Sequence, residues 1–206
     1  MGTDLCIACR TSLPRVTSAC ARCAAPLKGD LLDALCGRCQ IKPPDFERTL
    51  AVFVYEQPMD YLLQRLKFDG RLEMARVLGE LMAVELESII EDWPDALIPV
   101  PLHDERLRER GFNQSLELGR FIAKRLQLPL HPQVCRRLRS TESQSGLSRK
   151  ARMKNVKGAF SVRGELKGHL AIIDDVLTTG STAHEMARSL LQAGAERVDV
   201  WVCARA

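Results

Sequence analysis

Two hydrophobic periods alternate along the chain. Short runs rich in β-branched residues predict strands, and segments with apolar residues three or four positions apart predict helices. The predicted strands span residues 49–55, 96–100, 160–162, 169–173 and 198–203. The predicted helices span residues 59–68, 72–90, 116–126 and 181–192. This mixture of strands and helices is typical of an α/β protein.

The segment from residue 171 to 182, AIIDDVLTTGST, joins a predicted strand to the last predicted helix. Its loop offers hydroxyl groups, a glycine that tolerates unusual backbone angles and the free N–H groups of a helix N-terminus, which together suit a phosphate. Asp174 and Asp175 precede this loop at the C-terminal edge of the strand, where open α/β sheets place ligands. Carboxylates repel a phosphate, so we expect them to bind sugar hydroxyls or Mg²⁺. A phosphate and a diol together indicate a ribose phosphate.

A purely structural role would also account for these residues, because Ser, Thr and Asp favour turns and helix N-caps without any ligand. Two other nucleotide sites are disfavoured. The sequence lacks a G-x-G-x-x-G after a strand, as in a dinucleotide-binding Rossmann domain, and a G-x-x-x-x-G-K nucleotide-triphosphate loop.

The composition is ordinary for a globular protein: 206 residues, of which 46% are hydrophobic and 27% charged. The length suits one main domain with a small appendage. No apolar run approaches the length of a membrane span, and the N-terminal residues lack the features of a secretory signal, so we expect a cytoplasmic protein. The net charge of +4 is too small by itself to indicate nucleic-acid binding.

Six of the eight cysteines lie in the first forty residues, as three C-x-x-C pairs. In a reducing cytoplasm, thiolates at this spacing favour a tetrahedral zinc ion over a disulfide. We assign Cys20, Cys23, Cys36 and Cys39 to one zinc ribbon. So short a module cannot bury a core of its own, so zinc would supply its folding free energy.

The other cysteines have different expected roles. Cys6 and Cys9 are either a remnant pair or competitors for the same ion. A redox-active C-x-x-C is a further interpretation, but the βαβ pattern of a thioredoxin-like site is missing. Cys135 and Cys203 stand alone among apolar residues, and we expect them to be inert core residues.

Arginines at alternate positions follow the second predicted strand, in PLHDERLRERGFNQS. Arg106, Arg108 and Arg110 are expected in a loop that opens a helix, where their guanidinium groups would bind a second anion such as pyrophosphate. A solvated face would also explain them. Lys67, near the end of a predicted helix, is expected to be exposed and to interact with the helix dipole rather than with a ligand.

Basic residues are concentrated between positions 136 and 157, where eight Lys or Arg residues stand against one acid. The polar, glycine-containing middle of this segment is typical of a mobile loop. The segment would close over a negatively charged substrate as a lid, or neutralise nucleic-acid phosphates through Arg149, Arg152 and Lys154, or remain a solvated loop without a ligand. Only Phe160 lies nearby among aromatic residues, so the segment does not favour base stacking.

Over nearly its whole length, the chain resembles the ComF or GntX family. The motifs that carry this resemblance are the N-terminal cysteine pairs, KPPDFERT at 42–49, LKFDGR at 66–71, PVPLHDERLRERGFNQS at 99–115, QSGLSRKARMKNVKGAF at 144–160, and the aspartate-containing segment at 171–182. Many members carry four C-x-x-C pairs, whereas this chain has three. The pair that would complete a first ribbon with Cys6 and Cys9 is therefore missing.

The resemblance implies a type I phosphoribosyltransferase-like domain, a parallel sheet flanked by helices, at residues 45–206, after a zinc-ribbon module at residues 1–44. In such domains an acidic pair faces the ribose hydroxyls of 5-phosphoribosyl pyrophosphate (PRPP), which binds with Mg²⁺, and the next loop wraps the 5-phosphate. The candidate PRPP-binding residues are Asp174, Asp175, Val176, Leu177, Thr178, Thr179, Gly180, Ser181, Thr182, Arg106 and Arg108. The candidate catalytic residues are Asp174, Asp175 and Arg110.

For function, the resemblance implies a cytoplasmic role in natural transformation, in which the protein handles incoming single-stranded DNA with a helicase-type partner. Some members are linked to gluconate use. We therefore expect a PRPP-binding protein of DNA uptake. The alternative is an active phosphoribosyltransferase for an unidentified base or amine, in which pyrophosphate would leave the anomeric carbon with help from Mg²⁺ and the arginines.

Overall fold

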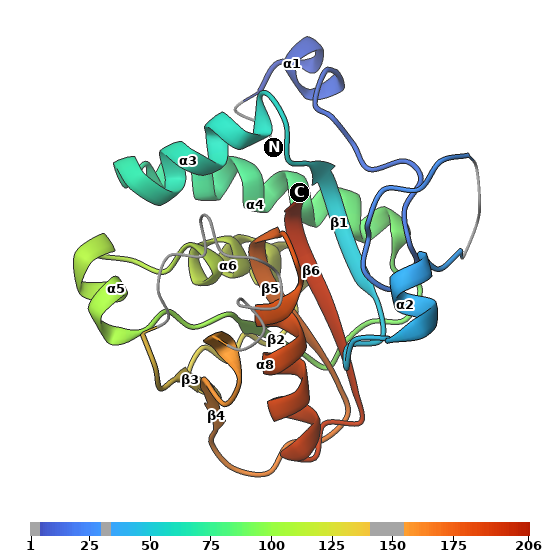
Figure 1. Cartoon of the computed structure of the whole chain (residues 1–206). Coiled ribbons are helices and arrows are strands. Elements are labelled where there is room, and N and C mark those ends of the chain that lie inside the picture. The colour runs from blue at the N-terminus through green and yellow to red at the C-terminus, as the bar shows by residue number, and fades with distance from the viewer. Residues whose placement is uncertain (1–4, 30–33, 141–154) are drawn as a thin grey trace.

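The computed structural model describes residues 5–29, 34–140 and 155–206. These residues contain a four-stranded parallel sheet in the order β1-β6-β5-β2 (Figure 1). Its strands are β1 (Thr49–Val54), β2 (Ala96–Pro99), β5 (His169–Leu177) and β6 (Arg197–Arg205). Helices cover both faces of the sheet, which explains why β6 is apolar almost throughout instead of alternating with polar residues.

The helices are divided between the two faces (Figure 1). On one face, α4 (Leu72–Ile89) and α6 (Gln114–Leu126) pack on the strands, and α3 (Met59–Asp69) packs on α4. On the other face lies α8 (Ser181–Gln192). The two apolar cores that result lie on opposite sides of the sheet, around Trp201 and Leu78 on the α4 side and around Ile172 and Met186 on the α8 side.

Smaller elements surround this centre. They are α1 (Ile7–Thr11), α2 (Gly37–Ile41), α5 (Asp104–Arg110) and the antiparallel hairpin of β3 (Cys135–Arg137) and β4 (Phe160–Val162). The cysteine-rich N-terminal residues pack on the α8 side, where Cys20, Cys23 and Cys39 share a core with Phe46. The division of the chain at residue 44 stays a prediction.

The expected parallel sheet flanked by helices is confirmed, and most predicted elements agree with the structure within two residues. The helix predicted to begin at residue 116 begins at Gln114, because the Asn113 side chain accepts hydrogen bonds from the backbone N–H groups of Ser115 and Leu116. β5 continues to Leu177 rather than ending at Ile173, because its pairing with β6 persists to its last residue. No helix in the described ranges is long and apolar enough to cross a membrane.

Candidate functional site

Two adjacent carboxylates form the centre of the site, in the C-terminal half of β5. Asp174 Oδ1 accepts hydrogen bonds from Ser115 Oγ and from the backbone N–H of Asp175, each at 2.9 Å. The Asp175 side chain is almost fully buried, and its Oδ2 lies 2.8 Å from Lys67 Nζ. The acid pair therefore belongs to the strand itself, and partners from α3 and α6 hold it in place.

The position of Lys67 corrects an expectation from the sequence. The exposed lysine predicted at the end of a helix is in fact partly buried against Asp175, with 20% of its side chain accessible. Burial by itself disfavours the charged amine, but attraction to Asp175 and Asp174 outweighs this and raises the pKa of Lys67. Lys67 is thus a charge partner of the acid pair that the sequence-based prediction missed.

The two carboxylates differ electrostatically, since Asp175 forms an ion pair with Lys67 at 2.8 Å, whereas hydrogen bonds from Ser115 and the Asp175 backbone contact Asp174. Burial and the neighbouring Asp175 charge raise the pKa of Asp174 to about 7, although Lys67 and hydrogen bonds from Asp175 and Ser115 oppose this. One carboxylate is consequently poised to exchange a proton near neutral pH. A cation or a sugar diol that binds there would favour the ionised form.

The predicted phosphate loop connects this strand to α8. Gly180 has φ +77°, a left-handed conformation that favours glycine, and α8 begins at the next residue. The hydroxyls of Thr179 and Ser181 lie 2.9 Å apart at this helix N-terminus. Thr178 is exposed and Thr182 half-buried, whereas Val176 and Leu177 belong to β5. The structure thus places hydroxyls and a helix N-terminus directly after the acid pair, as predicted.

The arginine segment differs from the predicted loop, since Arg106, Arg108 and Arg110 lie on the short helix α5. Residues four apart share a helix face, whereas a residue two positions away lies on the other side. Arg106 and Arg110 are accordingly half-buried and Arg108 is exposed. Arg110 donates a 2.7 Å hydrogen bond to Gln114 Oε1 and is attracted to Asp175, so it is brought to the acid pair, and Arg108 is not.

A further arginine near the acids was not singled out by the sequence. Arg137 on β3 is 9% exposed and lies 5.7 Å from the ring centroid of Phe160 on β4. Burial and the nearby Arg106 lower its pKa, while Asp174 opposes this change. Arg110 on α5 and Arg137 on β3 therefore bring positive charge to the carboxylates from two separate elements, and Arg106 lies near both of these arginines.

The predicted zinc ligands converge. The sulfur atoms of Cys20, Cys23, Cys36 and Cys39 all lie within 4.8 Å of one another. The sulfurs of Cys23 and Cys36 are 3.7 Å apart, which fits one edge of a tetrahedron with Zn–S bonds of about 2.3 Å. Burial opposes ionisation of Cys20, but backbone N–H groups of Cys36, Cys23 and Arg22 outweigh it and lower the pKa of Cys20 to about 6. A four-thiolate zinc ion fits these residues.

The remaining cysteines lie apart from this cluster. Cys6 and Cys9 are both exposed: Cys6 is the N-cap of α1 and Cys9 lies within that helix, where its backbone N–H donates to Cys6 Sγ at 3.5 Å. Cys135 and Cys203 are buried, as predicted for core residues, and burial raises the pKa of Cys135 to about 12.

Two arginines connect the cysteine cluster to the phosphate loop. Arg38 on α2 donates from Nη1 to the carbonyl oxygen of Thr179 at 3.2 Å. The buried Arg205 on β6 donates to the carbonyls of Cys23, at 3.1 Å, and Leu177, at 2.9 Å. The ribbon is therefore joined to the backbone on both sides of Thr178.

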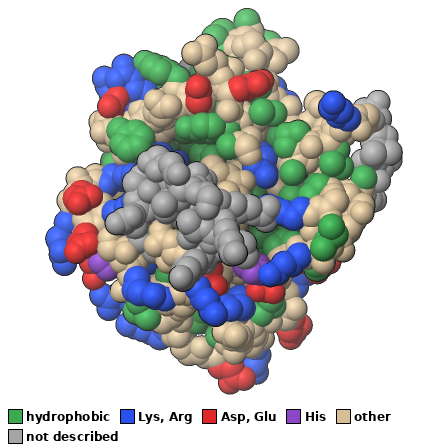
Figure 2. Space-filling model, in the orientation of Figure 1, with side chains coloured by type: hydrophobic (Ala, Val, Ile, Leu, Met, Phe, Trp, Pro, Cys, Tyr) green, Lys and Arg blue, Asp and Glu red, His purple; other side chains and the backbone are tan. Residues whose placement is uncertain are grey.

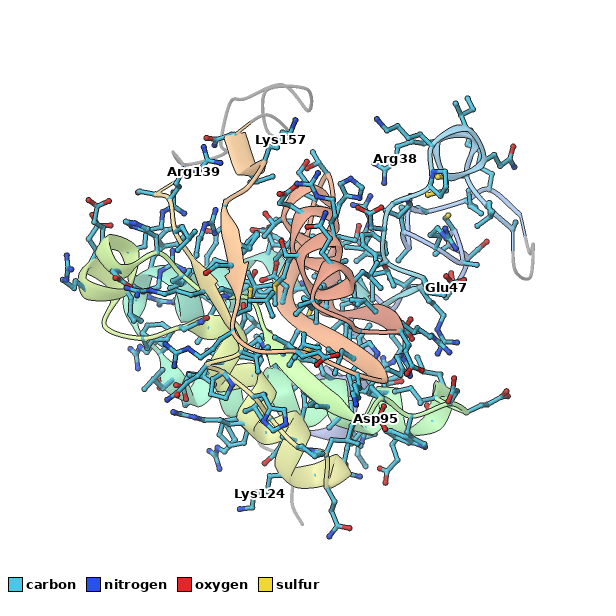
Figure 3. The ribbon with its side chains drawn as sticks, turned by 90° about the horizontal axis from the view of Figure 1, so that it is seen from below. Arg38, Glu47, Asp95, Lys124, Arg139 and Lys157 are labelled. Carbon is cyan, nitrogen blue, oxygen red and sulfur yellow. The ribbon has the colours of Figure 1, made fainter. Side chains whose placement is uncertain are left out.

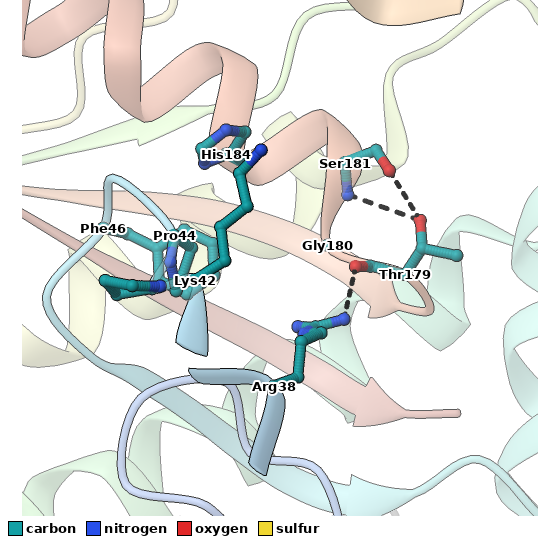
Figure 4. A pocket seen from close by; sticks show the side chains of 9 residues that line it. Arg38, Lys42, Pro44, Phe46, Thr179, Gly180, Ser181 and His184 are labelled. Atoms are coloured by element: carbon teal, nitrogen blue, oxygen red, sulfur yellow. Dashed lines mark hydrogen bonds between the residues drawn. The ribbon is translucent and has the colours of Figure 1, made fainter. Parts of the chain in front are cut away.

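Between the ribbon and the loop lies a cavity of about 260 Å³ (Figure 4). Its walls combine cationic or titratable side chains, an apolar base and the start of α8. The lining residues are Arg38, Lys42, Pro43, Pro44, Phe46, Thr179, Gly180, Ser181 and His184. The cavity adjoins the phosphate loop on its zinc-ribbon side.

The candidate nucleic-acid-binding residues Arg149, Arg152 and Lys154 lie outside the described residues. The described residues on either side of them lie close together, since Arg139 donates a hydrogen bond to the carbonyl of Lys157 (Figure 3).

Comparison with known proteins gives relatives over almost the full chain. DNA utilization protein YhgH of Salmonella typhimurium is 37% identical over 206 residues, which cover 98% of this chain and 90% of that protein. Competence protein F of Haemophilus influenzae is 34% identical over 179 residues, covering 83% and 78% of the two chains. No family model matches the chain. Among solved structures, a glutamine PRPP amidotransferase from B. subtilis covers 62% of this chain and 25% of its own, with a TM-score of 0.42 and 20% identity.

Proposed function

Because this chain belongs to the family of competence protein F and DNA utilization protein YhgH, the ComF family, we propose that it binds PRPP with Mg²⁺ and serves DNA uptake in the cytoplasm. The observation that carries the proposal is the acid pair on β5 followed directly by a hydroxyl-rich helix N-terminus. Asp174 and Asp175 would receive the ribose hydroxyls, and Thr179 and Ser181 the 5-phosphate.

The donor set suits Mg²⁺, which prefers oxygen ligands and binds through one or two carboxylates together with substrate phosphates. The hydrogen bonds that Asp174 accepts from Ser115 Oγ and from the Asp175 backbone are both directed at Oδ1. Asp175 is the less suitable ligand, because Lys67 already neutralises it. When bound, the ion would neutralise charge on the pyrophosphate and on Asp174.

Titration calorimetry with PRPP, with and without Mg²⁺, tests the binding site. We expect Asp174→Asn to weaken Mg²⁺-dependent PRPP binding at least tenfold, because it removes a charged ligand; loss of a charged hydrogen bond alone is about 1.5–3 kcal/mol. Asp92→Asn is the matched control, since Asp92 pairs with Arg197 at the N-terminal end of β6, the opposite end of the parallel strands from the acid pair. Unchanged affinity in Asp174→Asn would refute the assignment of the site.

An active phosphoribosyltransferase is the second candidate, favoured by Arg110 and Arg137 near the acid pair and by Arg106 close to both. Arg106, Arg110 and Arg137 would stabilise negative charge on departing pyrophosphate in a cationic, sugar-like transition state. Pyrophosphate release from PRPP with pooled bases and amines separates the candidates. Turnover that depends on one acceptor would establish the enzyme, and binding without turnover would favour DNA handling.

The role in DNA handling would include single-stranded DNA and a helicase-type partner. Arg149, Arg152 and Lys154 are the candidate phosphate contacts. Replacing all three by Gln should lower affinity for single-stranded DNA and reduce its salt dependence, since fewer counterions are released on binding. An unchanged salt slope would remove this segment from the proposal.

A further inference from the structure

The outer face of α3 exposes two aromatic rings on one side of the helix. Tyr61 is 54% exposed and Phe68 is 74% exposed. They are seven positions apart, about two helical turns, and so lie on the same face. Figure 2 shows hydrophobic side chains gathered on this surface, at the upper left where Figure 1 places α3. Exposed rings of this size have no role in either apolar core.

Each ring has a guanidinium group over it. The Arg65 guanidinium lies 5.2 Å from the Tyr61 ring centroid, and its Nε donates to the Tyr61 hydroxyl at 2.9 Å. The Arg110 guanidinium lies 5.7 Å from the Phe68 centroid. Arg65 also pairs with Asp69, but both side chains of that pair are more than 40% exposed, so the pair is weak. Rings and cations therefore occur together along one stripe: Tyr61, Arg65, Phe68 and Arg110.

The stripe ends at the acid pair. Lys67, the residue before Phe68, contacts Asp175. Arg110, at the same end of the stripe, is attracted to Asp175 and bonds Gln114, whose neighbour Ser115 bonds Asp174. A ligand that lay on Phe68 would therefore lie beside the candidate ribose site.

We infer that this stripe binds single-stranded nucleic acid, with bases stacked on Phe68 and Tyr61 and phosphates near Arg65 and Arg110. Exposed rings combined with cations form the stacking surfaces of proteins that bind single strands with little sequence preference. Between Tyr61 and Phe68 the helix rises about 10 Å, which is longer than one base and requires a ligand with several. The inference rests on the proposed role in DNA uptake and assigns that role a surface distinct from residues 149–154.

The test uses the full chain and a fluorescently labelled oligo-dT, with anisotropy measured at several salt concentrations. We expect Phe68→Ala and Tyr61→Ala each to weaken binding about fivefold to tenfold, the lower part of the range for loss of base stacking. The salt slope should not change, because no cation is removed. Phe68→Trp should restore binding, since it keeps a stacking ring.

Trp93→Ala is the matched control. Trp93 is also exposed, at 39%, but precedes the N-terminal end of β2, whereas Arg110 follows the C-terminal end of that strand, so loss of Trp93 should leave affinity unchanged. Thermal melting checks that every variant is folded. PRPP affinity, measured on the same samples, should be the same in Tyr61→Ala as in wild type, because Tyr61 contacts Arg65 and not Arg110.

The outcomes separate this inference from the proposed function. Wild-type affinity for oligo-dT in the Tyr61→Ala, Phe68→Ala double variant, with PRPP binding intact, would overturn the stripe alone. Absence of PRPP binding in the wild type would overturn the proposed function. Phe68-dependent binding of free adenine or guanine, with no binding of oligo-dT, would overturn the single-strand assignment and identify Phe68 as an acceptor-base contact.

Discussion

The cysteine cluster and the acid pair are both candidate metal sites, but the chain builds them differently. The cluster takes all four sulfurs from one stretch of twenty residues, Cys20 to Cys39. The acid pair takes its partners from distant elements: Ser115 is 59 positions from Asp174, and Lys67 lies on α3. The first site can therefore be assembled by local spacing, whereas the second depends on the folded sheet and two of its helices.

This difference explains why the two sites respond differently to their surroundings. The cluster sulfurs all lie within 4.8 Å of one another, an arrangement that suits one shared metal ion. The acid pair already has protein partners, and those partners make its two members unequal: Asp175 is neutralised by Lys67, and Asp174 has a pKa raised to about 7 by burial and by Asp175. The cysteine cluster brings together four groups that one metal ion could bind, whereas protein side chains already contact the two carboxylates of the acid pair.

Zinc removal should give the largest effect. Structural zinc supplies apparent free energies of about 10–16 kcal/mol to small zinc-finger peptides. We expect Cys20→Ser with Cys39→Ser to abolish zinc binding and to unfold the ribbon, with the parallel sheet retained. Elemental analysis of the purified protein gives the metal content, and amide hydrogen exchange locates the loss of structure.

The matched control replaces Cys6 and Cys9 by Ser. Both thiols are exposed and lie apart from the cluster, so this variant should keep one zinc per chain. Loss of zinc in the control would show that the first C-x-x-C pair shares the ion. If the wild-type protein, purified without chelator, contained no zinc, the assignment of a zinc ribbon would be refuted.

The members of the acid pair should respond to Asn in opposite directions. Asp175→Asn leaves the Lys67 amine buried without its carboxylate and should destabilise the fold by about 3 kcal/mol, the lower end for a broken buried ion pair. Asp174→Asn removes a carboxylate whose ionisation is disfavoured, and should stabilise the ligand-free protein above pH 7. Denaturant unfolding curves at pH 5 and pH 8 measure both effects.

The pH dependence follows from the sign of the Asp174 shift. Its pKa is higher in the folded state, about 7, than its ordinary value of 3.8, so the folded protein binds more protons between these values. The protonated form of Asp174 therefore contributes stability that is lost as pH rises from about 4 to about 7. Over this range the free energy of unfolding falls by at most about 1.4 kcal/mol per pH unit. If the free energy of unfolding depended on pH in the same way in wild type and Asp174→Asn, the raised pKa of Asp174 would be contradicted.

The same contrast shows what the sequence can predict. The four zinc ligands, the bounds of α8 and the position of the acid pair follow from local spacing and from the residue types at a helix start. Two features depend on contacts between distant segments: Lys67 as an ion-pair partner of Asp175, and Arg137 buried near Asp174. The separation of Arg108 from Arg106 and Arg110 has a local cause, because α5 is a helix rather than the expected loop, and a helix turns alternate residues to opposite sides.

The smallest expected effect tests whether the two regions are coupled. Arg38 is the direct side-chain link from α2 to the phosphate loop, through the carbonyl of Thr179. Arg38→Met should lower the free energy of unfolding by about 1 kcal/mol, as for the loss of one partly buried hydrogen bond. It should also weaken PRPP binding about fivefold by loosening the loop, and a fivefold change in affinity corresponds to about 1 kcal/mol. Arg22→Met is the control, because Arg22 also joins the ribbon to the main domain, through Glu47, but does not contact the loop. Titration calorimetry measures the PRPP affinity of both variants. Weaker binding in Arg38→Met alone means that the ribbon supports the phosphate site. Equal affinity in both variants means that the ribbon and the acid pair act independently.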